Sequence, residues 1–318
     1  MRLTRFLPIL CLLLLAAPFS GRAEEKLTVR IGYQKYGTML LLKESGKLDA
    51  TLKAQGIAVD WREFPGGPQL LEALNVGAVD IGTTGEAPPI FAQAAGAPLV
   101  YVSVEPPAPH GEAIIVRKDS PIHSVADLKG RKVALNKGSN VHYLLVRALE
   151  EAGLAYTDIQ PVYLAPADAR AAFERGAVDA WAIWDPYYAS AAASGDTRIV
   201  ADGARADGSI LVPNHEFQLA HRKFYAAHAD VVKTIIDGLK DTEIALHDKQ
   251  AESARLLSPR TGVPVPVLET AFSRMGYGVG PITPEIAAEQ QHIADTFQSL
   301  GLIPRHITIA DALPGSGS

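Results

Sequence analysis

The sequence of 318 residues contains a single cysteine, Cys11. It lies in an N-terminal leader, so the rest of the chain has no thiol for a disulfide bond, for nucleophilic attack or for thiolate coordination of a metal. The nine histidines are scattered, and no pair has the spacing of a metal site. We therefore expect no bound metal, no cofactor and no catalytic residues.

The chain also lacks an excess of positive charge and any membrane-spanning apolar run. Its formal net charge of −5 argues against a nucleic-acid partner and against a polybasic membrane patch. The apolar run FLPILCLLLLAA is too short to span a bilayer comfortably. It follows the basic MRLTR and precedes the small residues Gly21 and Ala23, which is the pattern of a secretory signal peptide cut after Ala23. We expect an exported, soluble protein of the bacterial periplasm.

What the sequence does contain is an internal repeat. The stretches GAVDIGTTGE (77–86) and GAVDAWAIWD (176–185) both open with Gly-Ala-Val-Asp and close on an acid. A short helical stretch precedes each of them, starting at Pro68 or Pro166 and stopping at the motif glycine. Further upstream, LTVRIGYQ and RKVALNKGSN each predict a strand that leads into a helix, and Ser139 is the expected N-cap of the second helix. Each half thus has the order strand, helix, strand, helix, strand.

Two similar halves predict an α/β protein of two lobes that face each other, with mixed sheets flanked by helices. The chain after the second half predicts a further strand and long helices, which we expect to return to the first lobe. Two crossings between the lobes, near 113–116 and near 211–219, would make a hinge. The expected division is a signal peptide (1–23), lobe I (24–115 and 212–318) and lobe II (116–211).

Four loops are expected to point into the cleft between these lobes. Three of them, GYQKYGT, TTGEAPP and KGSNVH, hold small residues, hydroxyls and backbone N–H groups at helix starts. A helix start carries about half a positive charge and unpaired donors, so it can hold an anion without lysine or arginine. The fourth loop, WAIWDPYY (181–188), adds an apolar wall. These loops predict a site for a small anionic head group that carries a tail.

Two of the three tryptophans of the chain lie in the fourth loop. Trp181 and Trp184 are three positions apart, so they lie on opposite faces if the segment is extended. We expect Trp184 to face the cleft and Trp181 to pack inside its lobe. The alternative for an aromatic run on a strand is core packing for both residues.

Several long stretches resemble the aliphatic sulfonate-binding proteins of ABC transporters. They are EFPGGPQLLEALNVGAVDIGTTGEAPPIFAQAAGA, VYVSVEPP, KGSNVHYLLVRAL and PADARAAFERGAVDAWAIWDPYY, and the resemblance runs from 28 to 188 and more loosely to 309. It implies a type II periplasmic binding fold and capture of an organosulfonate as a sulfur source, for import through a membrane permease. We expect a monomer. The resemblance also implies that the following residues line the site: Gln34, Thr84, Gly85, Ser139, Asn140, Trp184 and Asp185.

Four further candidates come from the residues themselves. His142 stands in the first turn of a predicted helix that opens onto the cleft. Glu86, with Asp185, has the look of a catalytic carboxylate pair, but we favour a structural role that also selects against extra ligand charge. His215 and Glu216 lie in ARADGSILVPNHEFQL, which is longer than the usual crossing of the family and replaces smaller residues beside the cleft. The tail end of the ligand is therefore undetermined.

Other ligands and one other class of protein stay open. Taurine, nitrate, bicarbonate and aromatic sulfonates or sulfate esters are ligands of the same kind. Nitrate has no tail for the aromatic wall, and the ammonium of taurine needs a buried carboxylate such as Asp185 or Glu216. Pyrimidine-forming enzymes of thiamine biosynthesis share the implied fold. These enzymes need a cysteine-rich motif and work in the cytoplasm. The mature chain is expected to have no cysteine, and the sequence begins with a predicted export signal.

Overall fold

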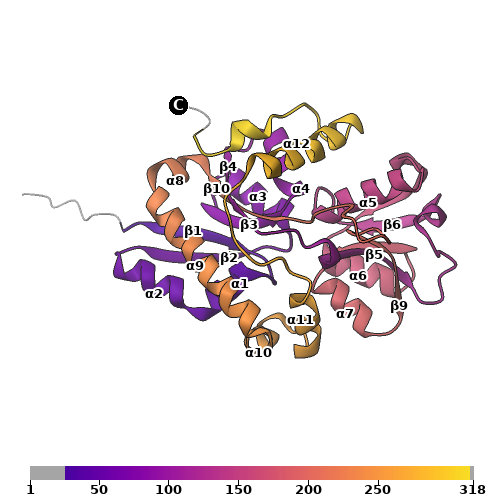
Figure 1. Ribbon diagram of the computed structural model, residues 1–318, viewed down its shortest axis with the longest axis horizontal. Helices are drawn as coiled ribbons and strands as arrows, with labels where there is room; N and C mark the ends of the chain where they lie inside the picture. Colours follow the sequence, from indigo (N-terminus) through magenta and orange to yellow (C-terminus); the bar gives the residue numbers. More distant parts are fainter. Residues whose placement is uncertain (1–25, 316–318) are drawn as a thin grey trace, which may run out of the picture.

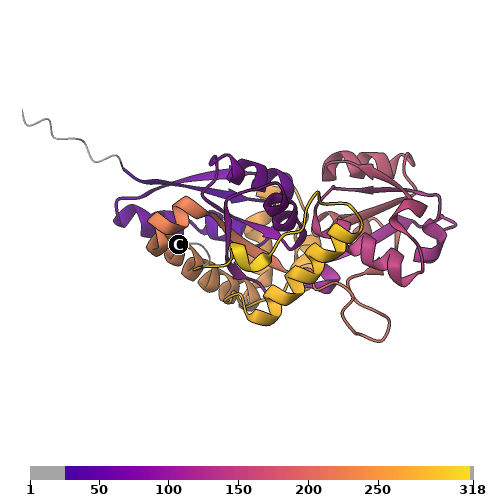
Figure 2. The same cartoon turned by 90° about the horizontal axis from the view of Figure 1, so that it is seen from above.

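The structure is a computed structural model that describes residues 26–315, so the predicted signal peptide lies outside the described residues. It contains two five-stranded sheets, each flanked by helices, which form two bodies side by side (Figures 1 and 2). The first sheet consists of β1 (Thr28–Tyr33), β2 (Ala58–Glu63), β3 (Ile81–Gly85), β4 (Leu99–Val104) and β10 (Glu216–His221). The second consists of β5 (Glu112–Arg117), β6 (Lys132–Leu135), β7 (Gln160–Tyr163), β8 (Ala180–Trp184) and β9 (Thr197–Asp202).

The two sheets have the same topology. Their strand orders are β2-β1-β3-β10-β4 and β7-β6-β8-β5-β9. In the first sheet β1 pairs in parallel with β2 and β3, and in the second β6 pairs in parallel with β7 and β8. The fourth strand of each sheet, β10 or β5, is antiparallel to both of its neighbours. The repeat read from the sequence is therefore present in the fold, and the predicted α/β class with mixed sheets is confirmed.

The helices follow the order that the repeat predicts. The first half contains α1 (Thr38–Ser45), α2 (Lys47–Ala54), α3 (Gly67–Asn75) and α4 (Ala87–Ala94), and the second contains α5 (Asn140–Glu151), α6 (Pro166–Glu174) and α7 (Tyr187–Ala193). The chain ends with α8 (Arg222–Ala227), α9 (Ala229–Asp248), α10 (Gln250–Thr261), α11 (Val265–Phe272) and α12 (Pro284–Ser299). The long helix α9 packs against α1 and α2 of the first sheet's body (Figure 1).

The chain crosses between the sheets twice, at 105–111 and at 203–215. The predicted first crossing at 113–116 is wrong, because these residues pair with β8 and β9 as part of β5. Their apolar sequence AIIV suits a buried strand as well as a connection. The predicted boundary between lobe I and lobe II at 115/116 therefore falls inside β5. The predicted return from lobe II to lobe I at 211/212 falls inside the second crossing.

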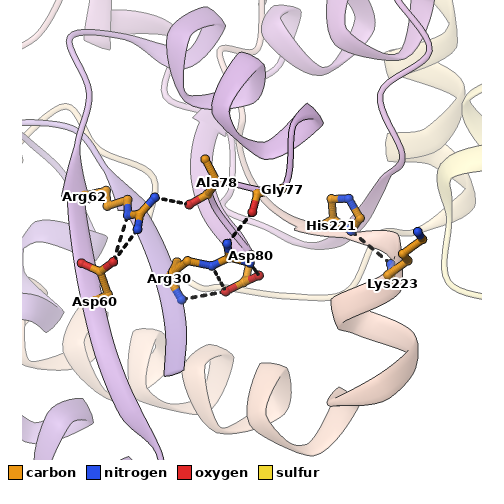
Figure 3. Close-up of polar contacts among 8 residues, drawn as sticks. All are labelled: Arg30, Asp60, Arg62, Gly77, Ala78, Asp80, His221 and Lys223. Carbon is orange, nitrogen blue, oxygen red and sulfur yellow. Dashed lines mark hydrogen bonds and ion pairs between the residues drawn. The ribbon is translucent and has the colours of Figure 1, made fainter. Parts of the chain in front are cut away.

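The aspartate of each Gly-Ala-Val-Asp motif makes an equivalent contact in its own half. Asp80 accepts hydrogen bonds from the backbone N–H of Arg30 at 2.8 Å and from its Nε at 2.9 Å (Figure 3). In the second half, Asp179 accepts a hydrogen bond from the backbone N–H of Lys132 at 2.8 Å. Each aspartate thus ties the turn after a helix to the first strand of its own half.

Packing also joins the two bodies. Phe297 of α12 lies against His142 and Tyr143 of α5, with ring centroids 5.4 and 5.8 Å apart. Phe91 of α4 stacks on His142 at 5.9 Å. Helices of the first body therefore cover one face of α5 in the second. Among the described residues, no helix is long and apolar enough to cross a membrane.

Candidate functional site

A cavity of about 320 Å³ lies between the two bodies, and both contribute to its wall. It opens where β1, β3 and β8 end, as expected for the strand ends of facing α/β lobes. The sequence-predicted site residues on this wall are Gln34, Gly85, Ser139, Asn140, Trp184, Asp185 and Glu216.

Three helix starts face the cavity without a side-chain cap. They belong to α1, α3 and α5, whose residues Thr38, Gly67 and Asn140 line the wall. Gly37 and Gly66 precede α1 and α3 and have no side chain to offer as a cap. Ser139 occupies the N-cap position of α5 as predicted. Its hydroxyl donates to the carbonyl of Asn136 at 2.7 Å, so it does not cap the helix. Helix-start N–H donors from both bodies are thus directed to one space.

The two bodies are in close contact at Gly85 and Asn140. The Asn140 Nδ2 donates to Asn214 Oδ1 at 2.6 Å, and the Ala87 N–H donates to Asn140 Oδ1 at 3.5 Å. A Cβ on Gly85 would lie 2.0 Å from the Asn140 amide atoms. Glycine is therefore required at 85 by this contact rather than by an unusual backbone conformation.

The two tryptophans divide between cavity and core. Trp181 is 1% exposed and packs at 5.8 Å from the ring of Phe173 inside the second body. Trp184 lines the cavity, and its indole reaches across to the start of α3, where a Cβ on Gly66 would lie 3.8 Å away. The strand alternation predicted from their spacing is present in β8.

An ion pair crosses the cleft between Asp185 and Arg274. Arg274 Nη1 lies 3.2 Å from both carboxylate oxygens, and its guanidinium stacks 4.1 Å above the ring of Tyr188. Burial raises the pKa of Asp185 to about 6, although Arg274 and the N–H of Ala189 favour the charged form. Sequence reasoning missed Arg274, because it follows α11 in a stretch with no recognisable motif.

Buried carboxyl groups gather where the two crossings meet the sheets. Glu105 and Glu216 line the cavity, and the Glu105 N–H donates to the Glu216 carbonyl at 2.7 Å. Burial raises the pKa of Glu216 to about 8. Burial also raises the pKa of Glu105 and Glu112 well above the usual range, and neighbouring carboxylates add to both shifts. Glu105 and Glu112 were not singled out from the sequence, since a lone glutamate beside a strand carries no signal of its own.

Four predicted site residues do not lie on the cavity wall: Thr84, Glu86, His142 and His215. His142 is fully buried between aromatic rings, and its Nδ1 accepts the Gly138 N–H at 3.2 Å. Burial lowers the pKa of His142 to about 4, so the imidazole is neutral. A side chain in the first turn of a helix can point in several directions. The side chain of His142 points toward α4 and α12.

The other three residues, His215, Glu86 and Thr84, form hydrogen bonds in the segments next to the cavity. His215 is 4% exposed and its Nδ1 bonds to the Glu105 carbonyl at 2.9 Å. Glu86 accepts the His215 N–H at 3.0 Å, which joins the start of α4 to the second crossing. This contact fits the structural role expected for Glu86. The hydroxyl of Thr84 bonds locally, to the carbonyl of Gly85 at 2.9 Å.

Within residues 26–315, no group of three or more histidine, cysteine, aspartate or glutamate side chains is placed to hold a metal ion.

Comparisons with known proteins give consistent relatives. A family model described as NMT1/THI5 like matches residues 52–252. The chain is 46% identical to a protein of Escherichia coli (strain K12) named for aliphatic sulfonate binding, over 88% of this chain and 86% of that protein. It is similar in structure to the alkanesulfonate-binding protein SsuA from Xanthomonas axonopodis pv. citri bound to MOPS. That match has 40% identity and a TM-score of 0.85, and it covers 92% of this chain and 99% of the other. The periplasmic aliphatic sulphonate binding protein SsuA from Escherichia coli matches with 44% identity and a TM-score of 0.80, covering 92% and 93%.

Proposed function

The chain belongs to the family of aliphatic sulfonate-binding proteins, and from this premise we propose that it binds alkanesulfonates in the cavity between its lobes and presents them to the permease of an ABC importer. Its fold is that of a periplasmic binding protein, as expected from the sequence. The relatives that share 40% identity or more with it are named as binding proteins rather than enzymes, so we interpret the carboxylates of the cleft as ligand contacts and not as a catalytic pair.

The observation that carries the proposal is the meeting of uncapped helix starts on one cavity. A sulfonate is ionised at all ordinary pH values and has three equivalent oxygens to accept hydrogen bonds. The starts of α3 and α5 supply donors from opposite lobes, at Gly67 and Asn140. Donors of this kind hold an anion without a lysine or arginine. A ligand that contacts both lobes also favours an arrangement in which they are closed around it.

The tail of the ligand is assigned to the wall formed by Trp184. Its indole spans from β8 to the start of α3, so it lies beside the proposed head-group site. Flat apolar surface next to an anion site suits a ligand with an ionic head and a hydrocarbon tail. Nitrate and bicarbonate would leave this wall without a contact.

The periplasm is the compartment in which this family works. We place cleavage of the signal peptide after Ala23 and a monomer as the mature form. The permease partner follows from membership of the family, because such proteins deliver their ligand to a membrane importer.

Calorimetric titration of the mature protein tests this function. The panel contains linear alkanesulfonates, the carboxylates of the same lengths, sulfate and nitrate. Tris buffer is required, because a relative binds the sulfonate buffer MOPS. We expect the sulfonates to bind about tenfold or more tightly than the matched carboxylates, a difference of about 1.4 kcal/mol. Binding of nitrate or sulfate in preference to every sulfonate would overturn the proposal.

A further inference from the structure

The sulfur atoms of this chain are few, and their placement is not scattered. The sequence has three methionines and one cysteine, of which Met1 and Cys11 lie in the predicted signal peptide. The two that remain, Met39 and Met275, both line the cavity between the two bodies. Every thioether of residues 24–318 is therefore on the wall of the proposed ligand site.

The fold brings these two residues to one apolar region of the first body. Met39 is the second residue of α1, whose start faces the cavity. Met275 follows α11, and its backbone N–H donates to the Phe272 carbonyl at 3.2 Å. Both methionines pack in the same apolar cluster as Phe272, and the ring of Tyr36 stacks on Phe272 at 5.7 Å. Met39 and Met275 thus share a region that is apolar on the protein side and open to the cavity on the other.

A thioether suits such a wall, and a sulfoxide does not. Methionine is flexible and apolar, so it fits an irregular surface and the hydrocarbon tail of a ligand. Its sulfoxide is polar and carries an oxygen that accepts hydrogen bonds. The nearest cation along the chain, Arg274, already lies 3.2 Å from both carboxylate oxygens of Asp185. A sulfoxide oxygen here is either left without a donor or takes Arg274 from its partner, and both outcomes are costly.

The two thioethers differ in how an oxidant reaches them. Met275 is partly exposed, whereas Met39 is 2% exposed and meets solvent on its cavity side. Because oxidation follows exposure, Met275 should react before Met39. A ligand that fills the cavity covers the open side of both residues. Occupancy of the cavity and oxidation of its wall therefore oppose each other.

We propose that Met39 and Met275 are oxidative modification sites, at which peroxides convert the thioethers to sulfoxides and thereby weaken sulfonate binding. The substrate class is hydrogen peroxide or an alkyl peroxide small enough to enter the cavity. This inference rests on the proposed function and adds a control of the same site.

The modification is a balanced oxygen transfer. A sulfur lone pair attacks one oxygen of hydrogen peroxide, and the S–O bond forms as the O–O bond breaks. The departing hydroxide takes up the proton of the transferred oxygen and leaves as water. Sulfur loses the two electrons that the peroxide gains. Methionine sulfoxide reductases reverse the step, since the oxygen leaves as water while a dithiol is oxidised to a disulfide.

The sites are tested first by peptide mass spectrometry of the mature protein during treatment with hydrogen peroxide in Tris buffer. We expect one added oxygen on Met275, followed by one on Met39. Saturation with a linear alkanesulfonate should slow both reactions. Equal rates with and without the ligand would show that it does not cover these side chains, and the inference would be wrong.

The effect on binding is tested by calorimetric titration of the untreated and the doubly oxidised protein with alkanesulfonates. If each sulfoxide removes the apolar contact of about one methylene group, affinity should fall about fourfold per site. Treatment with methionine sulfoxide reductases should restore both the mass and the affinity. Affinity that stays low after the mass is restored would assign the loss to other damage.

Variants locate the effect. Met39→Leu and Met275→Leu exchange a thioether for a hydrocarbon of similar volume, and melting curves check that the variants fold. For each variant, the affinity before peroxide is compared with the affinity after it. Each single variant should lose less affinity than the wild type, and the double variant should lose none.

A third change supplies the matched control. Adding Leu256→Met to the double variant places a thioether on α10, at a side chain that is 43% exposed and outside the cavity wall. This thioether should be oxidised without loss of affinity. A loss equal to that of the wild type would show that the two cavity methionines are not responsible.

The outcomes separate this inference from the proposed function. If the untreated protein binds alkanesulfonates and full oxidation leaves the affinity unchanged, the modification sites are wrong and the sulfonate function stands. The inference is also wrong if Met39 and Met275 resist peroxide under conditions that oxidise the thioether introduced by Leu256→Met. If the untreated protein binds no alkanesulfonate, the function and its control by oxidation are both overturned.

Discussion

At the scale of single residues, we expect Trp184 to contribute to ligand binding and Trp181 to stability, although both lie on β8. Burial of each ligand methylene against Trp184 should contribute about 0.8 kcal/mol, so affinity should rise several-fold per carbon until the cavity is full. We expect Trp184→Ala to flatten this dependence in titrations with a series of alkanesulfonates. Trp181→Ala should instead lower the free energy of unfolding by about 3–5 kcal/mol, because its side chain is 1% exposed. Unchanged binding of the series by Trp184→Ala would return that residue to a packing role.

Glu86 makes stability depend on pH. Burial raises its pKa to about 8 in the folded protein, above the ordinary value of 4.5, although the His215 and Asn214 N–H groups oppose the shift. The folded state therefore holds a proton that the unfolded state releases, and stability falls as pH rises from 4.5 to about 8. We expect urea unfolding to give a smaller loss of stability across this window for Glu86→Gln than for the wild type. Its facing carboxylates, Glu216 and Glu289, keep their own contributions.

Glu72→Gln is the control for this pH dependence, because Glu72 is exposed on α3 and is not among the groups that act on Glu86. It should follow the wild-type slope. Equal slopes for Glu86→Gln and the wild type would show that Glu86 is not protonated in the folded protein at neutral pH.

At the scale of elements, the aspartates of the two Gly-Ala-Val-Asp motifs should contribute unequally to the free energy of unfolding, although they occupy equivalent positions. Asp80 is 4% exposed and binds both the backbone and the guanidinium of Arg30, whereas Asp179 binds only the backbone of Lys132. Asp80→Ala leaves a cation without its partner, so it should destabilise the protein by about 3 kcal/mol. Asp179→Ala removes one exposed hydrogen bond and should cost about 1 kcal/mol. Equal losses in denaturant unfolding would contradict this ranking.

The contact between the start of α4 and the start of α5 should limit how far the lobes close. A Cβ at 85 would lie 2.0 Å from the Asn140 amide, whose bonds to Asn214 and Ala87 hold it in place. We therefore expect Gly85→Ala to lower sulfonate affinity by about tenfold, as closure is opposed. Small-angle scattering should show a larger radius of gyration than the wild type at saturation. Removing the Asn140 side chain as well should restore the compact shape, and failure to do so would locate the defect elsewhere.

At the scale of the whole molecule, the two crossings between the bodies lead us to expect that the lobes move when a ligand binds. A ligand that contacts helix starts on both sides binds the closed arrangement better than an open one, so it shifts the population toward closure. We expect scattering of the wild type to give a smaller radius of gyration with a tight sulfonate than without. An identical profile at saturation would count against the hinge.

Much of this protein follows from local signals in its sequence. Proline at a helix start, glycine after a helix end and the spacing of apolar residues depend on the backbone within one turn or one strand. These signals were enough for the repeat, the two α/β halves and the alternation of Trp181 and Trp184. They were also enough to place Gln34, Gly85, Ser139, Asn140 and Asp185 at strand ends that face one space.

Only the tertiary structure decided which side chains share that space. Arg274 and Glu105 reach the cavity from segments far from its motifs, and no local pattern reports such a meeting. His142 is turned away because α4 and α12 of the other lobe pack on its helix, and Thr84 and Glu86 are covered by their neighbours. The sequence by itself determined the elements and the helix starts that we propose to bind the anion, since these depend on neighbours along the chain, and its resemblance to known sulfonate binders indicated the family. The charge balance of the cavity and the contact between Gly85 and Asn140 depend on neighbours in space, so they arise only when the two lobes meet.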